Sequence, residues 1–194
     1  MKLTLYGQSN NWERFSIRKK QDTFQAARKK ILVRDDYACR FCHFRSPEND
    51  IINLDHNYRH NKADNLAVAC PLCAQCTLLD FYQIGYGGKD QMVFLPEMQQ
   101  EQVNQLCRLL FCRMKGEGET AYNAQMVYAQ LQDRVKKLED VSGAKLTHPG
   151  VFLYYLHSNN ANHSLISSVR WLPSIEHFEA HIPHWTERLA DDLS

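Results

Sequence analysis

The sequence has almost no net charge and no long apolar segment. Its 194 residues include 23 Lys and Arg against 22 Asp and Glu, which gives a formal charge of +1. A chain with this balance offers no global electrostatic attraction to nucleic acid or to an anionic membrane. No run approaches the ~18 apolar residues that a bilayer span needs, so we expect no transmembrane helix.

The first residues do not have the long apolar core of a signal peptide. We therefore expect a cytosolic protein, in which thiols stay reduced. Its seven cysteines are then better explained as metal ligands, catalytic groups or small core residues than as a disulfide framework. The remaining composition is ordinary, with 44% hydrophobic residues, and the length suits one generous domain or two small ones.

Four cysteines form two Cys-x-x-Cys pairs, Cys39 with Cys42 and Cys70 with Cys73. Each pair can present two thiolates from one tight turn to a tetrahedral Zn²⁺. The 27 residues from 43 to 69 exceed the usual interval of about 15–20, and a small inserted hairpin would account for the difference. A thioredoxin-like redox role is the alternative, but no βαβ pattern surrounds either pair. We predict one structural zinc ion held by all four cysteines.

The other three cysteines have separate interpretations. Cys76 lies three residues beyond Cys73, so it could replace a ligand or pack beneath the second pair, and packing is favoured. Cys107 and Cys112 lie in an apolar run with nothing nearby to act as the base of a nucleophile. We expect both of them in the core.

The apolar periodicity predicts an α+β fold. Residues 22–35 carry a helical stripe, and residues 50–56 and 66–69 have the character of short strands. A helix should follow from Cys70 to about Phe81, with a proline in its first turn. Two strands followed by a zinc-anchored helix are therefore expected.

Helical periodicity dominates the rest of the sequence. Residues 85–88 form a glycine-rich turn without the Gly-Lys-Ser/Thr of a phosphate loop, and residues 91–95 suggest a strand. Helices are predicted over residues 97–113 and 119–140, and a final amphipathic helix after Pro173. The apolar side of the second of these helices is expected to consist of Tyr122, Met126, Ala129, Val135 and Leu138.

These segments divide the chain into two halves. Residues 1–95 would form a zinc-binding half, which begins with a strand or arm over residues 1–20. Residues 96–194 would form a mainly α-helical half. We expect the two halves to pack together as one compact unit.

Polar residues around the predicted strands resemble the motif of an HNH endonuclease. Residues 34–42 match that family's helix-to-knuckle entry, and the second cysteine pair matches its second zinc pair. Asp55 and His56 match the metal ligand followed by the general base, and Asn65 matches the asparagine that braces the loop. The resemblance implies a ββα zinc core in which a divalent cation polarises a phosphate and an imidazole activates water.

The last metal ligand of that motif is missing. It is usually a histidine directly after the second zinc pair, where this sequence has Ala74. Thr77 and Leu78 offer no replacement, and Asp80 should point to another face. One carboxylate cannot supply two ligands while the base stays free. We therefore expect no catalysis, a His56 that is hydrogen-bonded in a turn, and vestigial status for Asp55, His56 and Asn65.

A second resemblance covers almost the whole chain. It is carried by segments that occur in this order: Asn53-Leu54-Asp55, Cys73-Ala74-Gln75-Cys76, Gly85-Tyr86-Gly87-Gly88, Leu95-Pro96-Glu97, Leu106-Cys107-x-x-Leu110-Phe111-Cys112 and Arg170-Trp171-Leu172-Pro173-Ser174. In these segments the chain resembles the IcmJ (DotN) family of the Dot/Icm type IVB secretion system. That family shares the loss of the last nuclease ligand.

This resemblance implies a non-catalytic adaptor with an HNH-like zinc fold. Such a subunit binds the C-terminal tail of the inner-membrane coupling ATPase (DotL) and, with other coupling-complex subunits, helps assemble the complex that receives effector proteins. We expect it in the cytoplasm, peripheral to the inner membrane through the ATPase. The resemblance assigns no residue to the ATPase contact.

Two other functions stay open. One is a metal-dependent endonuclease that uses Asp55, His56 and Asn65, against which the missing ligand counts. The other is a non-catalytic zinc module that binds nucleic acid, against which the neutral charge counts. The basic loop of Arg59, His60 and Lys62 is interpreted as solvated rather than as a phosphate clamp.

Overall fold

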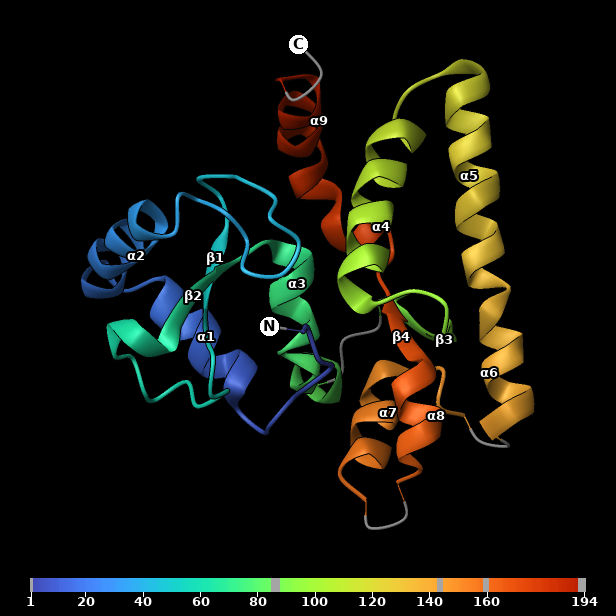
Figure 1. The fold of residues 1–194 in the computed structure, drawn as a ribbon, viewed down its shortest axis with the longest axis horizontal. Helices are drawn as coiled ribbons and strands as arrows, with labels where there is room; N and C mark the ends of the chain where they lie inside the picture. Colours follow the sequence, from blue (N-terminus) through green and yellow to red (C-terminus); the bar gives the residue numbers. More distant parts are fainter. Residues whose placement is uncertain (1, 85–87, 143–144, 159–160, 192–194) are drawn as a thin grey trace. The chain divides into compact units, whose positions relative to one another are not determined.

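The computed structural model of the protein describes residues 2–84, 88–142, 145–158 and 161–191. The chain forms two compact units, Met1–Tyr86 and Gly87–Ser194, coloured blue to green and green to red in Figure 1. Both are mixed α/β, mostly helical, and each has one two-stranded sheet among its described residues. None of the described helices is both long and apolar enough to cross a membrane. Residues 85–87 of the predicted glycine-rich turn lie outside the described residues.

The first unit is built on a β-hairpin. Strands β1 and β2 run antiparallel, with Asp50 opposite Ala69 and Asn53 opposite Leu66. All their residues are buried, because helices α2 and α3 both contact the hairpin and Ile31 of α2 packs in one apolar cluster with the strands. The elements are α1 (Asn11–Lys19), α2 (Asp22–Arg34), β1 (Asp50–Asn53), η1 (Ala63–Asn65), β2 (Leu66–Ala69), α3 (Pro71–Cys76) and η2 (Leu79–Ile84), where η marks a 3₁₀ helix.

Two elements of this unit differ from the prediction. Residues 11–19 form a helix rather than a strand or arm, and its buried Phe15 packs with Tyr58 and Leu78. The helix expected to reach residue 81 ends at Cys76. After Cys76 the N–H groups of Thr77 and Leu78 bond three residues back, to the carbonyls of Ala74 and Gln75, and the Leu79 N–H donates to the Tyr6 carbonyl at 2.9 Å, so the α-helical hydrogen-bond ladder does not continue.

The second unit packs helices around the strand pair β3 and β4. These strands are far apart in the sequence and antiparallel, with Gln91 opposite Leu172. Strand β3, expected in the zinc-binding half, therefore belongs to this unit. The elements are β3 (Gln91–Phe94), α4 (Gln100–Met114), α5 (Gly118–Gln132), α6 (Arg134–Ser142), α7 (Pro149–Leu156), α8 (His163–Ser168), β4 (Val169–Leu172), η3 (Glu176–His181) and α9 (Ile182–Asp191).

The sequence segment Arg170–Ser174 covers most of β4 and the two residues after it. The Gln100 side chain, buried on α4, donates from Nε2 to the Trp171 carbonyl and accepts from the Trp171 N–H, both at 2.8 Å. The amide thus satisfies the strand backbone as a neighbouring strand would. Arg170 donates to the Met98 carbonyl at 2.5 Å, and Tyr128 to the Pro173 carbonyl at 2.8 Å. The segment is a structural element of the core.

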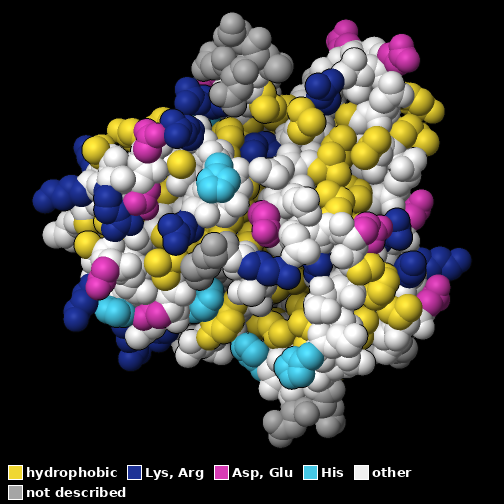
Figure 2. Space-filling view, in the orientation of Figure 1, with side chains coloured by type: hydrophobic (Ala, Val, Ile, Leu, Met, Phe, Trp, Pro, Cys, Tyr) yellow, Lys and Arg dark blue, Asp and Glu magenta, His cyan; other side chains and the backbone are white. Residues whose placement is uncertain are grey.

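The helix predicted over residues 119–140 is two helices. Leu138 of the second, α6, is buried as expected, but the buried face of the first, α5, differs from the predicted one. Tyr122 and Met126 are 60% and 46% exposed, and the small residues Ala121 and Ala124 face inward instead. Helices α4 and α5 lie side by side (Figure 1), and small side chains let two helices approach closely. Figure 2 shows hydrophobic side chains gathered on the outer surface over α4 and α5.

Candidate metal centre

Four cysteine side chains meet in the first unit. The sulfur atoms of Cys39, Cys42, Cys70 and Cys73 all lie within 4.8 Å of one another, and the Sγ atoms of Cys42 and Cys70 are 3.5 Å apart. A tetrahedral site with metal–sulfur bonds of about 2.3 Å has edges of about 3.8 Å, whereas a disulfide bond is about 2 Å long. The donor set therefore fits a tetrahedral metal ion, and none of the four cysteines forms a disulfide bond.

The first cysteine pair lies in the loop after α2. The His43 N–H donates to the Cys39 carbonyl and the Cys39 N–H to the Phe44 carbonyl, both at 2.9 Å. His43 has a left-handed φ of 60°, which turns the chain back on itself. The Arg40 N–H donates to the Val68 carbonyl at 2.8 Å. This bond fastens the loop to β2, directly before the second pair.

The second pair lies at the start of α3. Cys70 is the residue that precedes the helix, and Cys73 is in its first turn. The Ala74 N–H donates to the Cys70 carbonyl at 2.8 Å, and Pro71 fits the first turn because its missing N–H would have no helical partner there. The hairpin predicted from the long interval between the pairs is β1–β2, and it returns the chain from the first pair to the second.

Burial sets the chemistry that these thiols can perform. The four side chains are at most 4% exposed, so a soluble substrate has no access to them. Burial also raises the pKa of the Cys70 thiol well above its usual range. A bound cation would reverse this effect by displacing protons and stabilising the thiolates. The arrangement suits a structural metal better than a redox or nucleophilic site.

The remaining cysteines pack in the protein. The Cys76 thiol donates to the Leu72 carbonyl one turn earlier at 3.3 Å, and it is not part of the four-sulfur group. Cys107 is fully buried on α4. Cys112 is partly buried, and its burial raises the pKa of the thiol. The expected packing role therefore fits the position of each.

Asp55 and Asn65, two of the HNH-like positions, hold the loop between β1 and β2 together. Asp55 Oδ2 pairs with His60 Nδ1 at 2.7 Å, and Asp55 Oδ1 accepts from the Asn57 N–H at 2.9 Å and from Asn65 Nδ2 at 2.8 Å. Burial opposes the ionisation of Asp55, but the hydrogen bonds from His60, Asn57 and Asn65 outweigh it and lower its pKa to about 2. Both carboxylate oxygens thus have protein partners.

Asn65 and His60 have clear places in this loop. Asn65 Nδ2 also donates to the His60 carbonyl at 2.7 Å, and Asn65 Oδ1 accepts from the Asp55 N–H at 3.0 Å. Asn65 therefore braces the loop, as the resemblance implies. His60 belongs to the basic loop that the sequence predicts to be solvated; its side chain is 40% exposed, and its ring also pairs with Asp55. Its spacing of five residues from Asp55 has no regular periodicity that would have revealed the pair.

His56 is stacked rather than hydrogen-bonded through its ring. Its imidazole lies on the Tyr6 ring with 4.1 Å between centroids, and its Nδ1 is buried without a hydrogen-bond partner among the described residues. Only its backbone matches the expectation, since the His56 carbonyl accepts from Asn11 Nδ2 at 2.7 Å. Burial lowers the pKa of His56, so the ring is neutral at pH 7.

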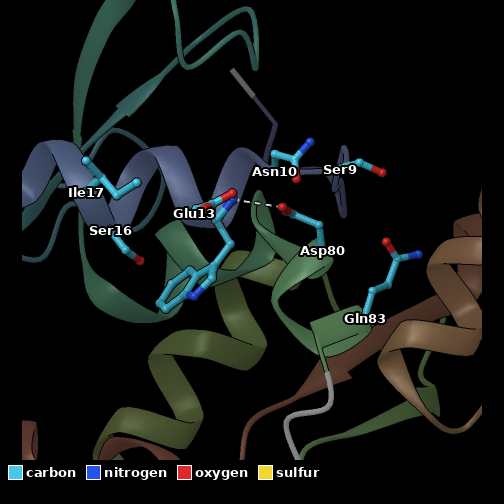
Figure 3. A pocket seen from close by; sticks show the side chains of 8 residues that line it. Ser9, Asn10, Glu13, Ser16, Ile17, Asp80 and Gln83 are labelled. Carbon is cyan, nitrogen blue, oxygen red and sulfur yellow. Dashed lines mark hydrogen bonds between the residues drawn. The ribbon is translucent and has the colours of Figure 1, made fainter.

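The residues after the second pair add no ligand to this loop. Ala74 is buried in α3, and the Thr77 hydroxyl donates to the Ala74 carbonyl at 2.8 Å. Asp80 accepts from the Trp12 N–H at 2.8 Å and so serves the start of α1 (Figure 3). Among the described residues, the four cysteines are the only group of three or more His, Cys, Asp or Glu placed closely enough to hold a metal ion.

Arg18 positions the hairpin loop, a role that the sequence did not reveal. The residue is buried on α1, and its guanidinium carbon lies 4.4 Å from the centroid of Phe24 and 4.6 Å from that of Tyr58. It donates to the side-chain oxygen of Asn53 and to the Ile51 carbonyl at 2.6 Å. Its partners are distant in sequence, so only the folded chain brings them together.

Comparison with known proteins identifies the family. No protein-family model matches the chain. The type 4 apparatus protein DotN of Legionella pneumophila subsp. pneumophila (strain Philadelphia 1) is 30% identical over 198 aligned residues, which cover 99% of this chain and 92% of that protein. The chain belongs to the DotN (IcmJ) family. The similarity to DotN covers 99% of the chain, so it includes both the unit with the four cysteines and the helical unit.

Proposed function

We propose that this protein is a non-catalytic, zinc-binding adaptor subunit of a type IV secretion apparatus. The likeness to DotN over nearly the whole chain carries the proposal, because DotN is a type 4 apparatus protein. In this role the protein binds the C-terminal tail of the coupling ATPase, joins other coupling-complex subunits and supports effector export. It acts in the cytoplasm, held at the inner membrane through the ATPase.

The metal in this proposal is a single structural zinc ion. Four thiolates from two Cys-x-x-Cys pairs form the donor set that closed zinc sites use. When bound, the ion would join the loop after α2 to the start of α3, and its binding free energy would become folding free energy. The hairpin β1–β2 followed by α3 would then be an HNH-like ββα core kept for its rigidity.

The polar loop supports a non-catalytic role. Asp55 already accepts hydrogen bonds from His60, Asn57 and Asn65, which gives its carboxylate a role within the loop that needs no cation. The ring of His56 is stacked on Tyr6, and Ala74 supplies no donor atom. A general base must reach the water that it activates, and here the loop residues stabilise one another instead.

The test combines metal analysis, tail binding and a nuclease assay on the purified chain. We expect one zinc per chain, specific binding of the coupling-ATPase tail but not of a scrambled tail, and no plasmid cleavage with Mg²⁺, Mn²⁺ or Ni²⁺. Cleavage by the wild type that His56→Ala abolishes would overturn the adaptor and favour the endonuclease. DNA binding without tail binding would favour the nucleic-acid module.

A further inference from the structure

The loop that carries the first cysteine pair has an unfavourable backbone conformation. Tyr37, two residues before Cys39, has a φ of 56°, and His43, directly after Cys42, has a φ of 60°. Neither residue is a glycine, and the left-handed region costs free energy for any residue that has a Cβ atom. Contacts from outside the loop must therefore hold it in the shape that brings the two cysteines together.

The side chain of Asn49 makes two such contacts. The residue is 0% exposed, and its Nδ2 donates to the Tyr37 carbonyl at 2.8 Å and to the Phe44 carbonyl at 2.9 Å. These carbonyls lie two residues before the first cysteine of the pair and two residues after the second. A single amide group thus closes the loop around the pair. The Asn49 carbonyl accepts from Arg28 at 2.7 Å, which ties the residue to α2.

The second atom of the amide shows what this residue is suited to. Asn49 Oδ1 is buried and has no hydrogen-bond partner among the described residues. An unpaired buried acceptor costs free energy, which an apolar side chain of the same size would avoid. The opposite amide orientation would place the oxygen against the two carbonyl oxygens, where only a donor fits. Asn49 is therefore suited to donating to these two carbonyls rather than to filling space.

Both carbonyls also have a backbone donor. The Phe44 carbonyl accepts from the Cys39 N–H at 2.9 Å, and the Tyr37 carbonyl accepts from the Ser46 N–H at 3.2 Å. Removing the Asn49 amide would leave neither carbonyl unpaired, so its main effect would be on the shape of the loop. Asn49 also directly precedes β1, whose partner β2 leads into the second cysteine pair. The amide thus connects the first pair to the hairpin that ends at the second.

We propose that Asn49 is a positioning residue of the metal centre. Its amide holds Cys39 and Cys42 in the ligating arrangement, so that the first half of the site is formed before the ion binds. The inference rests on the structural zinc of the proposed function and adds what sets its affinity. Ligands that are already arranged lose less conformational entropy when the ion binds, and residues that orient metal ligands typically change metal affinity by about 10–100-fold.

The first measurement is the zinc affinity of the whole chain, by competition with a chromogenic chelator under reducing conditions. Asn49→Leu keeps the approximate size of the side chain without its donors. Arg18→Lys is the matched control in the same unit, because the described hydrogen bonds of Arg18 to Asn53 and Ile51 reach β1 and not the loop of the first pair. We expect zinc binding by Asn49→Leu to be at least about tenfold weaker than by Arg18→Lys, although its free energy of unfolding is no lower.

Two further readouts separate positioning from a general loss of stability. The visible absorption of Co²⁺ bound in place of zinc reports the arrangement of the four thiolates. It should change in Asn49→Leu and match the wild type in Arg18→Lys. Adding His43→Gly to Asn49→Leu should restore part of the zinc affinity, because glycine adopts the positive φ at this position without steric cost. A packing role for Asn49 predicts no such rescue.

Asn49→Ser keeps the test available if the leucine variant does not fold. The serine hydroxyl has one hydrogen and can serve only one carbonyl, so zinc binding should again be weaker than in Arg18→Lys. The proposal is overturned if the Asn49 variants bind zinc as tightly as Arg18→Lys, if their Co²⁺ spectra match that of the wild type, or if His43→Gly restores no affinity. One zinc in the wild type with any of these results leaves the structural zinc standing without the role of Asn49. A wild type that binds no zinc overturns both.

Discussion

Replacing Cys73 by serine should remove the metal and destabilise the first unit. The Cys73 sulfur lies within 4.8 Å of three other cysteine sulfurs, and its side chain is fully buried. A serine hydroxyl keeps the size of the side chain approximately but does not ionise to a soft donor, so it is a poor zinc ligand. Three thiolates would remain, in a site without access for a replacement from solvent.

The expected loss of stability follows from the share of the zinc binding free energy that one ligand contributes. A structural zinc contributes about 10–16 kcal/mol of binding free energy at neutral pH. Divided equally among four thiolates, one ligand accounts for roughly 2.5–4 kcal/mol. Since 1 kcal/mol shifts the melting temperature by about 2–4 °C in chains of this size, the midpoint should fall by roughly 5–16 °C.

Two measurements and one matched control test this reasoning. Zinc per chain is measured by atomic emission, and the melting temperature by circular dichroism. Cys76→Ser is the control, because Cys76 is equally buried on the same helix, and a serine hydroxyl can replace its hydrogen bond to the Leu72 carbonyl. The reasoning is refuted if Cys73→Ser keeps one zinc and the wild-type midpoint, or if Cys76→Ser loses the metal.

Three further predictions concern the loop and the second unit. The pKa of Asp55 is lowered to about 2, so its ionised form stabilises the fold above pH ~4, and this contribution is lost as the pH falls toward ~2. Because the side chain is 39% exposed, Asp55→Asn should cost at most about 1 kcal/mol at pH 7. Urea unfolding should show that this difference shrinks below pH ~4, and a constant difference would contradict it. Gln100→Met removes both side-chain hydrogen bonds to the buried Trp171 backbone and should cost about 2–4 kcal/mol in urea unfolding, whereas Gln125→Met, at an exposed position, should cost almost nothing. Arg18→Lys keeps the charge but loses the planar fork, so it should cost about 2–3 kcal/mol and speed hydrogen exchange in the loop from residue 54 to residue 62; unchanged exchange would count against a positioning role.

The cysteine cluster could be predicted from the sequence because the geometry of each pair depends only on residues close together in the chain. Two residues three apart in a tight turn or at a helix start present both side chains to the same side. The spacing of the two pairs therefore predicted two half-sites, and the long interval predicted the hairpin between them. The short apolar segment at residues 66–69 was recognised as β2 for a similar reason, since its length and flanking residues suit a strand.

Other features depend on partners that are distant in sequence. Strand β4 exists because β3, nearly eighty positions earlier, supplies its hydrogen bonds. The buried face of α5 was predicted wrongly because its neighbour α4 selects small side chains such as Ala124 for contact and leaves Tyr122 outside. Helix α1 is anchored by Arg18, whose partner Ile51 lies in the hairpin, and by Asp80, which lies after α3 and accepts from the Trp12 N–H of α1. Periodicity within one segment carries no information about such partners.

The sequence by itself determined the cysteine ligand pattern, the absence of a donor at Ala74 and the order of most elements, since these follow from residue type and short-range spacing. Only the tertiary structure decided that the four sulfurs meet, that Asp55 is hydrogen-bonded by His60 and Asn65, and that Asp80 accepts from the backbone at the start of α1. Hydrogen bonding and burial act on whichever groups the folded chain brings within a few ångströms, and linear sequence does not encode that proximity explicitly.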